Sequence, residues 1–239
     1  MHYLNMANHV HAGAGVEITM TLVDESPSME EEDLVPTRKT AAVKANLKLA
    51  EVKAQHHPND RVGVIAFSAI ARVLLAPVVV RGSLPALRRA LQDADGGSGT
   101  NFTAALEMAE ECLFPSGSWY QARSVSRMLS ALLYETGHAK GAGLSPGQCP
   151  VDAVKRIVLL SDGEHNTGAS PVTVASRLKR AGVTIDCIGI AGSPDSVDED
   201  LLKEIASRNP DGTVRYCFIG DSDALLKKYQ DLARHIRCV

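Results

Sequence analysis

The sequence lacks the features that mark several large classes of protein. No apolar run reaches the ~18 residues that a membrane-spanning helix needs. Residues 1–15 have neither the basic start nor the apolar centre of a signal peptide. There is no basic stripe or arginine-rich segment and the net charge is −3, so nucleic acid is not an expected partner. We therefore expect a cytoplasmic protein that neither spans a membrane nor binds nucleic acid.

Paired cysteines and the common catalytic motifs are also missing. The five cysteines form no C-x-x-C pair, which argues against a disulfide framework and against a zinc site. The sequence contains no G-x-x-x-x-G-K-[ST] loop, G-x-G-x-x-G turn, H-E-x-x-H helix or G-x-S-x-G elbow. These absences lead us to expect a protein that is not an enzyme.

The patterns that are present alternate between strand and helix. Short, nearly continuous β-branched runs predict strands that are buried on both faces, as in a parallel sheet. These runs are Val16–Val23, Arg61–Phe67, Ala71–Val80, Arg156–Leu160, Val183–Ile190 and Val214–Ile219. Helical stretches lie between them at Thr37–His56, Leu84–Asp93, Phe102–Leu113, Pro171–Ala181, Asp198–Ser207 and Ser222–Ile236. The alternation predicts a doubly wound α/β fold with a mostly parallel central sheet and helices on both faces.

Two segments break this alternation. Only residues 68–70 separate Arg61–Phe67 from Ala71–Val80, which is too short for a crossover helix, so these strands should form an antiparallel hairpin. Pro77 favours an edge position for the second strand. We interpret residues 115–152 as an insertion that contains a helix at Tyr120–Tyr134. The expected organisation is a tail at residues 1–15 and one domain over residues 16–239.

Oxygen-bearing side chains follow the predicted strands at the end where doubly wound sheets bind ligands. Asp24, Ser26 and Ser28 come directly after the first strand, Asp162 comes after a later one, and Thr100 lies in a glycine-rich loop between two helices. In an extended loop the first three side chains would alternate and turn toward one point. Neighbouring glycines would let the other two loops approach closely. Such donors suit hard cations, namely magnesium, manganese or calcium.

These loops resemble the signatures of the von Willebrand factor A (VWA) family. DESPS, which begins at Asp24, resembles the family's DxSxS signature. GGSGTN resembles its threonine loop and LLSDGEHN its aspartate loop. The similarity runs from about Val16 to Ile236 and leaves out residues 115–152. It implies a Rossmann-like VWA domain with a metal-ion-dependent adhesion site (MIDAS).

The resemblance also implies a role for each matching residue. Ser26, Ser28 and Thr100 would coordinate Mg²⁺ directly, with Mn²⁺ or Ca²⁺ as alternatives, while Asp24 and Asp162 would act mostly through bound water. An Asp or Glu of a partner protein would fill an open coordination position, which makes the chain a metal-dependent protein–protein interaction module. Relatives inside bacterial cells often work beside AAA+ ATPases of the MoxR kind, so such an ATPase system is a candidate partner.

Two other functions stay open. An aspartate after the first strand is also found in magnesium-dependent phosphotransferases of the haloacid dehalogenase kind, but the second acid that those enzymes need is Ser26 here. Alternatively, the metal site is occupied but has no part in partner binding.

Near the site, the acidic run Glu30–Asp33 either favours the start of a helix or forms an acidic rim. We expect Glu25 and Glu164 to lie in solvent rather than to hold bound water.

Overall fold

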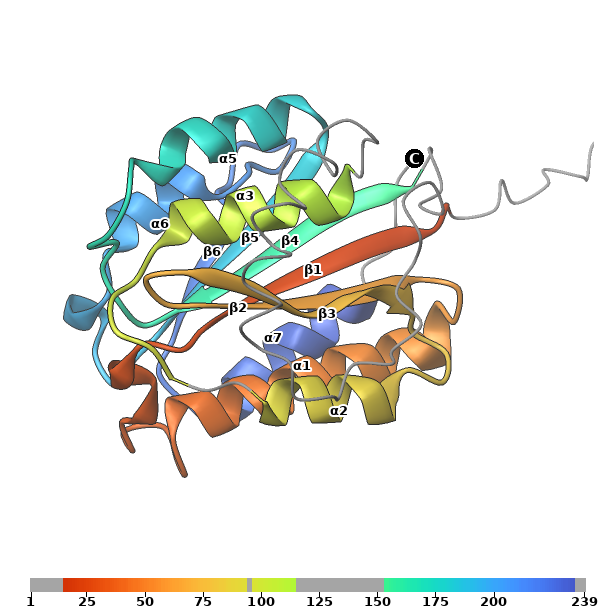
Figure 1. The fold of residues 1–239 in the computed structure, drawn as a ribbon, viewed down its shortest axis with the longest axis horizontal. Helices are drawn as coiled ribbons and strands as arrows, with labels where there is room; N and C mark the ends of the chain where they lie inside the picture. Colours follow the sequence, from red (N-terminus) through yellow and green to blue (C-terminus); the bar gives the residue numbers. More distant parts are fainter. Residues whose placement is uncertain (1–14, 94–95, 115–152, 235–239) are drawn as a thin grey trace, which may run out of the picture.

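The central sheet has the predicted mixed topology. A computed structural model of the protein describes residues 15–93, 96–114 and 153–234. Within these residues, six strands form one sheet in the order β3-β2-β1-β4-β5-β6 (Figure 1). They are β1 (Glu17–Asp24), β2 (Arg61–Phe67), β3 (Ala71–Val79), β4 (Val154–Ser161), β5 (Val183–Ile190) and β6 (Tyr216–Ile219). All neighbours pair in parallel except β2 and β3, so the expected antiparallel edge strand is confirmed.

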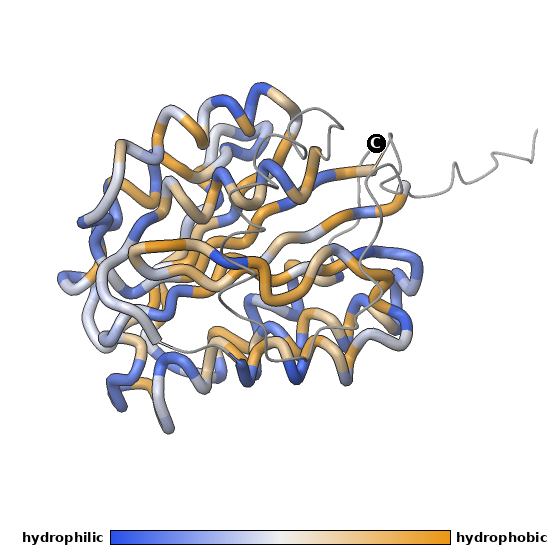
Figure 2. The backbone as a smooth tube through the Cα atoms, in the orientation of Figure 1, coloured by the Kyte–Doolittle hydropathy of each residue, from blue (hydrophilic) through white to orange (hydrophobic). Residues whose placement is uncertain are grey.

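Helices cover both faces of the sheet. One layer contains α1 (Arg38–His56), α2 (Leu84–Gln92) and α7 (Ser222–Arg234), and the other contains α3 (Phe102–Leu113), α5 (Pro171–Arg180) and α6 (Glu199–Ile205) (Figure 1). Side chains of β4 alternate between the two cores: Ile157 and Leu159 face the α3 side, and Val158 and Leu160 face the α1 side. Figure 2 shows these strands as largely hydrophobic segments between helices that mix polar and apolar residues. Burial on both faces explains why the strands read as continuous apolar runs.

The β2–β3 hairpin forms as predicted, with an irregularity that suits proline. Phe67 pairs with Ala71 at the turn, and Val62 pairs with Val78 near the other end. The register shifts between Val62 and Val64, opposite the stretch that contains Pro77. Proline lacks an N–H for the ladder, so an edge strand with a bulge accommodates it.

Several predicted boundaries change where side chains cap an element. The predicted helix Asp198–Ser207 is shorter at both ends. It starts after Asp198, whose side chain caps α6 by accepting a hydrogen bond from the backbone N–H of Leu201, and it ends before Ala206, whose ψ of 151° is not helical. The predicted strand Val214–Ile219 begins only at Tyr216, since Val214 bridges Arg208 in an antiparallel direction. Two short 3₁₀ helices, η1 (Pro27–Glu30) and η2 (Pro194–Ser196), were not predicted.

The proposed insertion at 115–152, its helix at Tyr120–Tyr134 and residues 1–14 of the tail lie outside the described residues. None of the helices described has both the length and the apolar composition that a membrane crossing requires.

Candidate metal site

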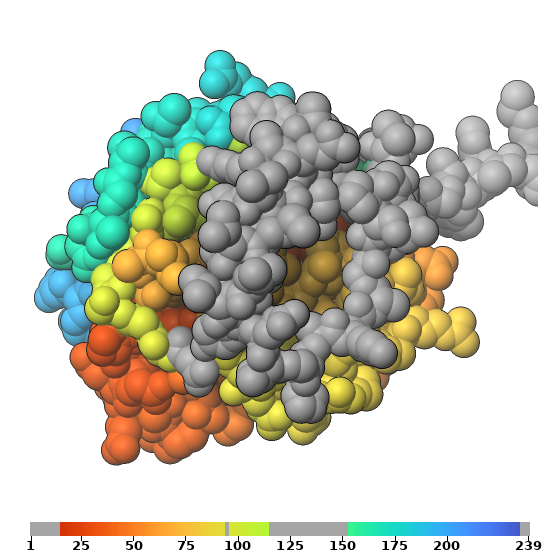
Figure 3. Space-filling view, viewed as in Figure 1, coloured from red at the N-terminus to blue at the C-terminus, as the bar shows by residue number. Residues whose placement is uncertain are grey.

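The predicted site lies where the winding of the sheet reverses. The chain passes from β1 through α1 to β2 on one side, and from β4 through α5 to β5 on the other, while β1 and β4 are neighbours. The loops that follow β1 and β4 therefore diverge and leave a crevice between them, which is the usual ligand position in such sheets. In the space-filling view, the segment after β1 (red to orange) and the segment before α3 (yellow-green) are adjacent at this end of the molecule (Figure 3).

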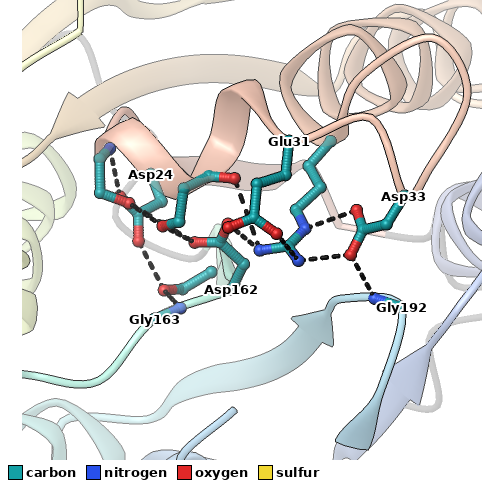
Figure 4. A network of polar contacts seen from close by, with 10 residues as sticks. Asp24, Glu31, Asp33, Asp162, Gly163 and Gly192 are labelled. Carbon is teal, nitrogen blue, oxygen red and sulfur yellow. Dashed lines mark hydrogen bonds and ion pairs between the residues drawn. The ribbon is translucent and has the colours of Figure 1, made fainter. Parts of the chain in front are cut away.

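The structure brings the DESPS loop and Asp162 into direct contact. Ser28 Oγ donates a hydrogen bond to Asp162 Oδ1 at 3.0 Å, and Ser26 Oγ lies 3.5 Å from the same oxygen. The two serine hydroxyls are 3.0 Å apart. Asp24 lies next to them: its Oδ1 accepts from the Ser26 backbone N–H at 2.8 Å and its Oδ2 from Ser161 Oγ at 2.6 Å (Figure 4). Residues 134–138 apart in the chain thus share one polar cluster.

Thr100 lies at the same cluster, opposite Gly163. A Cβ atom on Gly163 would stand 3.3 Å from Thr100 Oγ1 and 4.0 Å from Asp24 Oδ2. Glycine at this position therefore keeps open the space that these oxygens border. The crevice has a volume of about 490 Å³ and is lined in part by Ser26, Ser28, Thr100, Asp162 and Gly163.

Hydrogen bonds from the loop after β4 hold Thr100 in place. The Thr100 backbone N–H donates to Asn166 Oδ1 at 2.9 Å, and the Asn166 backbone N–H donates to the Thr100 carbonyl at 3.1 Å. Nearby, the backbone N–H of Phe102 donates to His165 Nδ1 at 3.2 Å, and the two rings stack. The roles of Asn166 and His165 were not predicted, although both follow Asp162 in the loop that resembles the VWA aspartate loop.

The glycines before Thr100 are needed for close packing against the β2–β3 turn. A Cβ on Gly97 would lie 2.2 Å from Ser68 Oγ, and Gly99 has a φ of 75°, which favours glycine. The backbone N–H of Asn101 donates to the Ser68 carbonyl at 2.8 Å, which fixes the loop to the turn. The predicted close approach of this loop is confirmed.

The convergence of the serines has a different cause from the predicted one. Ser26 is extended, with φ −60° and ψ 156°, but Ser28 lies in η1. The prediction of an extended loop with alternating side chains is therefore wrong beyond Ser26. A tight turn, begun by Pro27, returns Ser28 toward Asp162 instead.

Burial disfavours the ionised form of both aspartates of the site. Burial raises the pKa of Asp24 to about 6, against hydrogen bonds from Ser161 and Ser26 that lower it, and the nearby Asp162 charge raises it further. Burial also raises the pKa of Asp162, although hydrogen bonds from Arg38 and Ser28 lower it. A bound cation would relieve both costs, because opposite charge favours the ionised form of a carboxyl group.

Arg38 is the main participant that sequence reasoning missed. Its Nη1 donates to Asp162 Oδ2 at 2.7 Å, its Nη2 donates to Glu31 at 2.6 Å, and its guanidinium also binds Asp33 (Figure 4). Lys39 binds Glu30 at 2.8 Å. These ion pairs tie the acidic run to the start of α1, so Glu30, Glu31 and Asp33 do not form a rim of free charges. An arginine in the first turn of a helix opposes the helix dipole, and that was the available signal.

The two glutamates beside the site differ in their surroundings. Glu25 is buried and accepts hydrogen bonds from Arg72 Nη2 at 2.9 Å on both carboxylate oxygens. Its predicted place in solvent is wrong, because the cation on β3 compensates for its burial. Glu164 is exposed, as predicted, and lines the crevice.

The donors present are suited to a hard ion. In the part of the chain that the structure describes, no group of three or more His, Cys, Asp and Glu side chains could hold a metal. The cluster instead combines hydroxyl oxygens with the two buried aspartates. Oxygen donors of this kind fit Mg²⁺, which retains several of its waters, better than a soft transition metal.

Comparison with known proteins shows a similarity to one domain family. The family model of the von Willebrand factor type A domain matches residues 19–128, which include Asp24, Ser26, Ser28 and Thr100. Residues 19–128 are thus similar to a VWA domain. VWA domains are generally protein-interaction modules and are typically not enzymes.

Most of the chain is also similar to curated proteins of the UPF0353 group. A UPF0353 protein of Mycolicibacterium gilvum is 28% identical over 209 residues, which cover 79% of this chain and 52% of that protein. A similar protein of Mycolicibacterium vanbaalenii is 27% identical over 207 residues, with the same coverage of each chain. The chain thus spans about half the length of the curated relatives that it matches.

Solved structures share the fold at low sequence identity. BatB of Bacteroides thetaiotaomicron is 18% identical, with a TM-score of 0.61 over 92% of this chain and 98% of that one. Proximal thread matrix protein 1 of the mussel byssus, in a structure with zinc in its MIDAS motif, is 21% identical, with a TM-score of 0.62 over 92% of this chain and 48% of that one.

Proposed function

We propose that this VWA domain binds a divalent cation, Mg²⁺ foremost, and through it an acidic side chain of a partner protein. The observation that carries the proposal is the meeting of Ser28 and Asp162 at 3.0 Å, with Ser26, Asp24 and Thr100 around the same crevice. Ser26, Ser28 and Thr100 would hold the ion, and Asp24 and Asp162 would hold its waters. The bound ion would supply the positive charge that attracts a carboxylate.

The chain's own geometry supports this division of roles. Both oxygens of Asp24 already accept hydrogen bonds, from Ser26 and Ser161, and Asp162 Oδ2 accepts one from Arg38. The aspartates are thus engaged by protein donors, which leaves the hydroxyls as the natural direct ligands. An ion with few direct carboxylate ligands keeps more of its charge for an outside acid. A related mussel protein carries zinc in its MIDAS motif, so other divalent ions belong in the test.

Calorimetric titration with Mg²⁺, Mn²⁺ and Zn²⁺ tests the first half of the proposal. The wild-type chain should bind, and Ser28→Ala should abolish binding because it removes a ligand without introducing bulk. Ser176→Ala on α5 is the matched control, since Ser176 is also half-buried but lies away from the crevice. At a free ion concentration of about 100 times Kd, the metal should stabilise the wild type by about 2.7 kcal/mol. Equal titrations for Ser28→Ala and wild type would refute the proposed site.

Affinity capture from a lysate of the source cells tests the second half. The wild-type domain should retain a partner in Mg²⁺ and release it in EDTA, while Ser28→Ala should retain none in either buffer. A MoxR-type AAA+ ATPase is the first candidate to look for, on resemblance alone. If metal binds but the wild type and Ser28→Ala capture the same proteins, the site is structural and idle.

A further inference from the structure

Arg38 places a positive charge beside the oxygen cluster. Its side chain is 4% exposed, and its Nη1 lies 2.7 Å from Oδ2 of Asp162, whose side chain is fully buried. The opposite oxygen of Asp162 faces the two serine hydroxyls. One carboxylate thus lies between a fixed guanidinium and the place proposed for the metal ion (Figure 4).

The guanidinium is held in this place from its other sides. Arg38 Nε donates to Asp33 Oδ1 at 2.8 Å, and Nη2 donates to Glu31 Oε2 at 2.6 Å. Asp33 is itself fixed, because its Oδ2 accepts from the Gly192 backbone N–H at 2.7 Å. These contacts leave Arg38 no freedom to turn away from Asp162 when an ion enters. The positive charge is permanent, because an arginine side chain stays protonated throughout the pH range in which proteins are folded.

We infer that Arg38 weakens the binding of the divalent ion at this site. Its fixed positive charge shares the carboxylate of Asp162 with the ion. The inference rests on the proposed function, since it concerns the same metal site. Two cations that share one buried carboxylate repel each other, and the surrounding protein screens this repulsion less than water does. Arg38 also occupies Asp162 Oδ2, so that Asp162 has one oxygen, not two, directed toward the ion.

This role of Arg38 predicts that its substitution changes metal affinity in the opposite direction from the substitution of a residue that only holds a metal ligand in place. Removing an ordinary partner of a metal ligand typically lowers metal affinity by about 10–100-fold. Removing the Arg38 charge should instead raise it. Arg38→Gln should bind Mg²⁺ and Mn²⁺ at least ~10-fold more tightly than the wild type, which is a lower bound, because removing a unit charge several ångströms from a dication at an effective dielectric constant of about 20 accounts for more than this.

Calorimetric titration of folded variants is the direct test. Arg38→Lys keeps the charge but cannot reproduce the three-way hydrogen bonding of the guanidinium, so its affinity should lie closer to that of the wild type than to that of Arg38→Gln. Arg88→Gln on α2 is the charge-matched control, because Arg88 is exposed and lies outside the crevice, and its affinity should not change. Circular dichroism and thermal melting establish that each variant is folded. Unchanged or weaker binding by folded Arg38→Gln overturns the inference.

Two further variants keep the test decisive. If Arg38→Gln does not fold, Arg38→Gln combined with Asp33→Asn removes one positive and one negative charge together. It should still bind the ion more tightly than the wild type, though by less than Arg38→Gln would, because Asp33 contacts the guanidinium at Nε and Nη2 and not at the Nη1 that faces Asp162. Ser28→Ala added to each background separates this inference from the proposed function. If neither the wild type nor the Arg38 variants show binding that Ser28→Ala removes, the proposed metal site fails and the inference fails with it. If such binding exists but does not tighten without Arg38, only the inference fails.

Discussion

At the scale of single residues, Gly163 decides whether the crevice can hold an ion. It lies directly after Asp162, and a methyl group there would approach Thr100 Oγ1 to 3.3 Å and Asp24 Oδ2 to 4.0 Å. Its backbone is not in the left-handed region, so alanine adds volume without backbone strain. We expect Gly163→Ala to lower Mg²⁺ affinity at least ~10-fold, as loss of a supporting position around a metal does. The melting temperature in EDTA should change little.

Titration calorimetry and thermal melting in EDTA measure both quantities. Gly220→Ala is the control, because a Cβ there makes only ordinary contacts, the nearest at 3.5 Å to the Phe218 ring, and lies away from the crevice. If Gly163→Ala binds Mg²⁺ as tightly as the wild type, the ion does not occupy the space between Thr100 and Asp24.

The contrast between Thr100 and Arg38 shows what the sequence could reveal at this scale. Thr100 was predicted because its neighbouring glycines and its place in the fold carry a local signal. Arg38 was not predicted, because its contacts with Glu31 and Asp33 form only when the segment before α1 folds back over the start of that helix. The contact between Arg38 and Asp162 spans 124 positions in the chain and has no local pattern. The burial of Glu25 was missed for the same reason, because Arg72 belongs to another strand.

At the scale of elements, the packing of α7 on α1 contains a buried hydroxyl. Tyr229 of α7 is fully buried, and its hydroxyl lies beside Asn46 of α1 without hydrogen-bond geometry. Asn46 Nδ2 is directed instead to the Ala42 carbonyl at 2.9 Å. Tyr229→Phe should therefore change the free energy of unfolding by less than about 1 kcal/mol, because it removes a group that gains no hydrogen bond on folding.

Tyr229→Ala tests the packing of the same side chain. Loss of a buried aromatic ring should lower the free energy of unfolding by about 3–5 kcal/mol. Urea unfolding followed by circular dichroism measures both variants, and an unchanged m-value shows that the comparison is valid. A loss of more than about 1.5 kcal/mol in Tyr229→Phe would indicate that the hydroxyl does have a partner.

The sequence predicted which segments form helices and which form strands, because the spacing of apolar residues is a local pattern. It did not predict where all of these elements begin and end. The apolar run at Arg61–Phe67 became β2 with the predicted bounds, and Phe102–Leu113 became α3. The start of β6 moved because Val214 pairs with Arg208 across a turn. In α5 the predicted start at Pro171 is in place, but the side chain of the N-cap residue, Ser170, accepts no capping hydrogen bond. Such outcomes depend on tertiary contacts that no single segment encodes.

At the scale of the whole molecule, β1 connects two polar clusters of different kinds. Its last residue, Asp24, belongs to the candidate metal site, and its first, Glu17, belongs to a buried ion network. Lys53 Nζ donates to Glu17 Oε1 at 2.6 Å and to Asp60 Oδ2 at 2.9 Å, and Arg156 Nε lies 3.3 Å from Glu17 Oε2. The sequence patterns predicted the fold around this network but not the network itself, which joins α1, β1, β4 and Asp60, the residue before β2.

The network should make the stability of the domain depend on acid. Burial alone would raise the pKa of Glu17, but the charges of Lys53 and Arg156 outweigh it and lower the pKa from 4.5 to about 2. A lowered pKa in the folded state means that the ionised carboxylate stabilises the fold above pH 4.5, and that this contribution disappears as the pH falls toward 2. A difference of about 2.5 pH units corresponds to about 3 kcal/mol of stability.

Glu17→Gln tests this contribution against the exposed control Glu204→Gln. At pH 7 we expect Glu17→Gln to lose about 3 kcal/mol in urea unfolding, because Lys53 and Arg156 then each lose one of their two buried counter-charges and keep only Asp60 and Asp186. The difference from the wild type should shrink as the pH is lowered from 5 to 2, since the wild-type carboxylate is then also neutral. Glu204→Gln should follow the wild type throughout. A difference for Glu17→Gln that is equally large at pH 7 and pH 2 would mean that packing, not charge, is what Glu17 contributes at this end of β1.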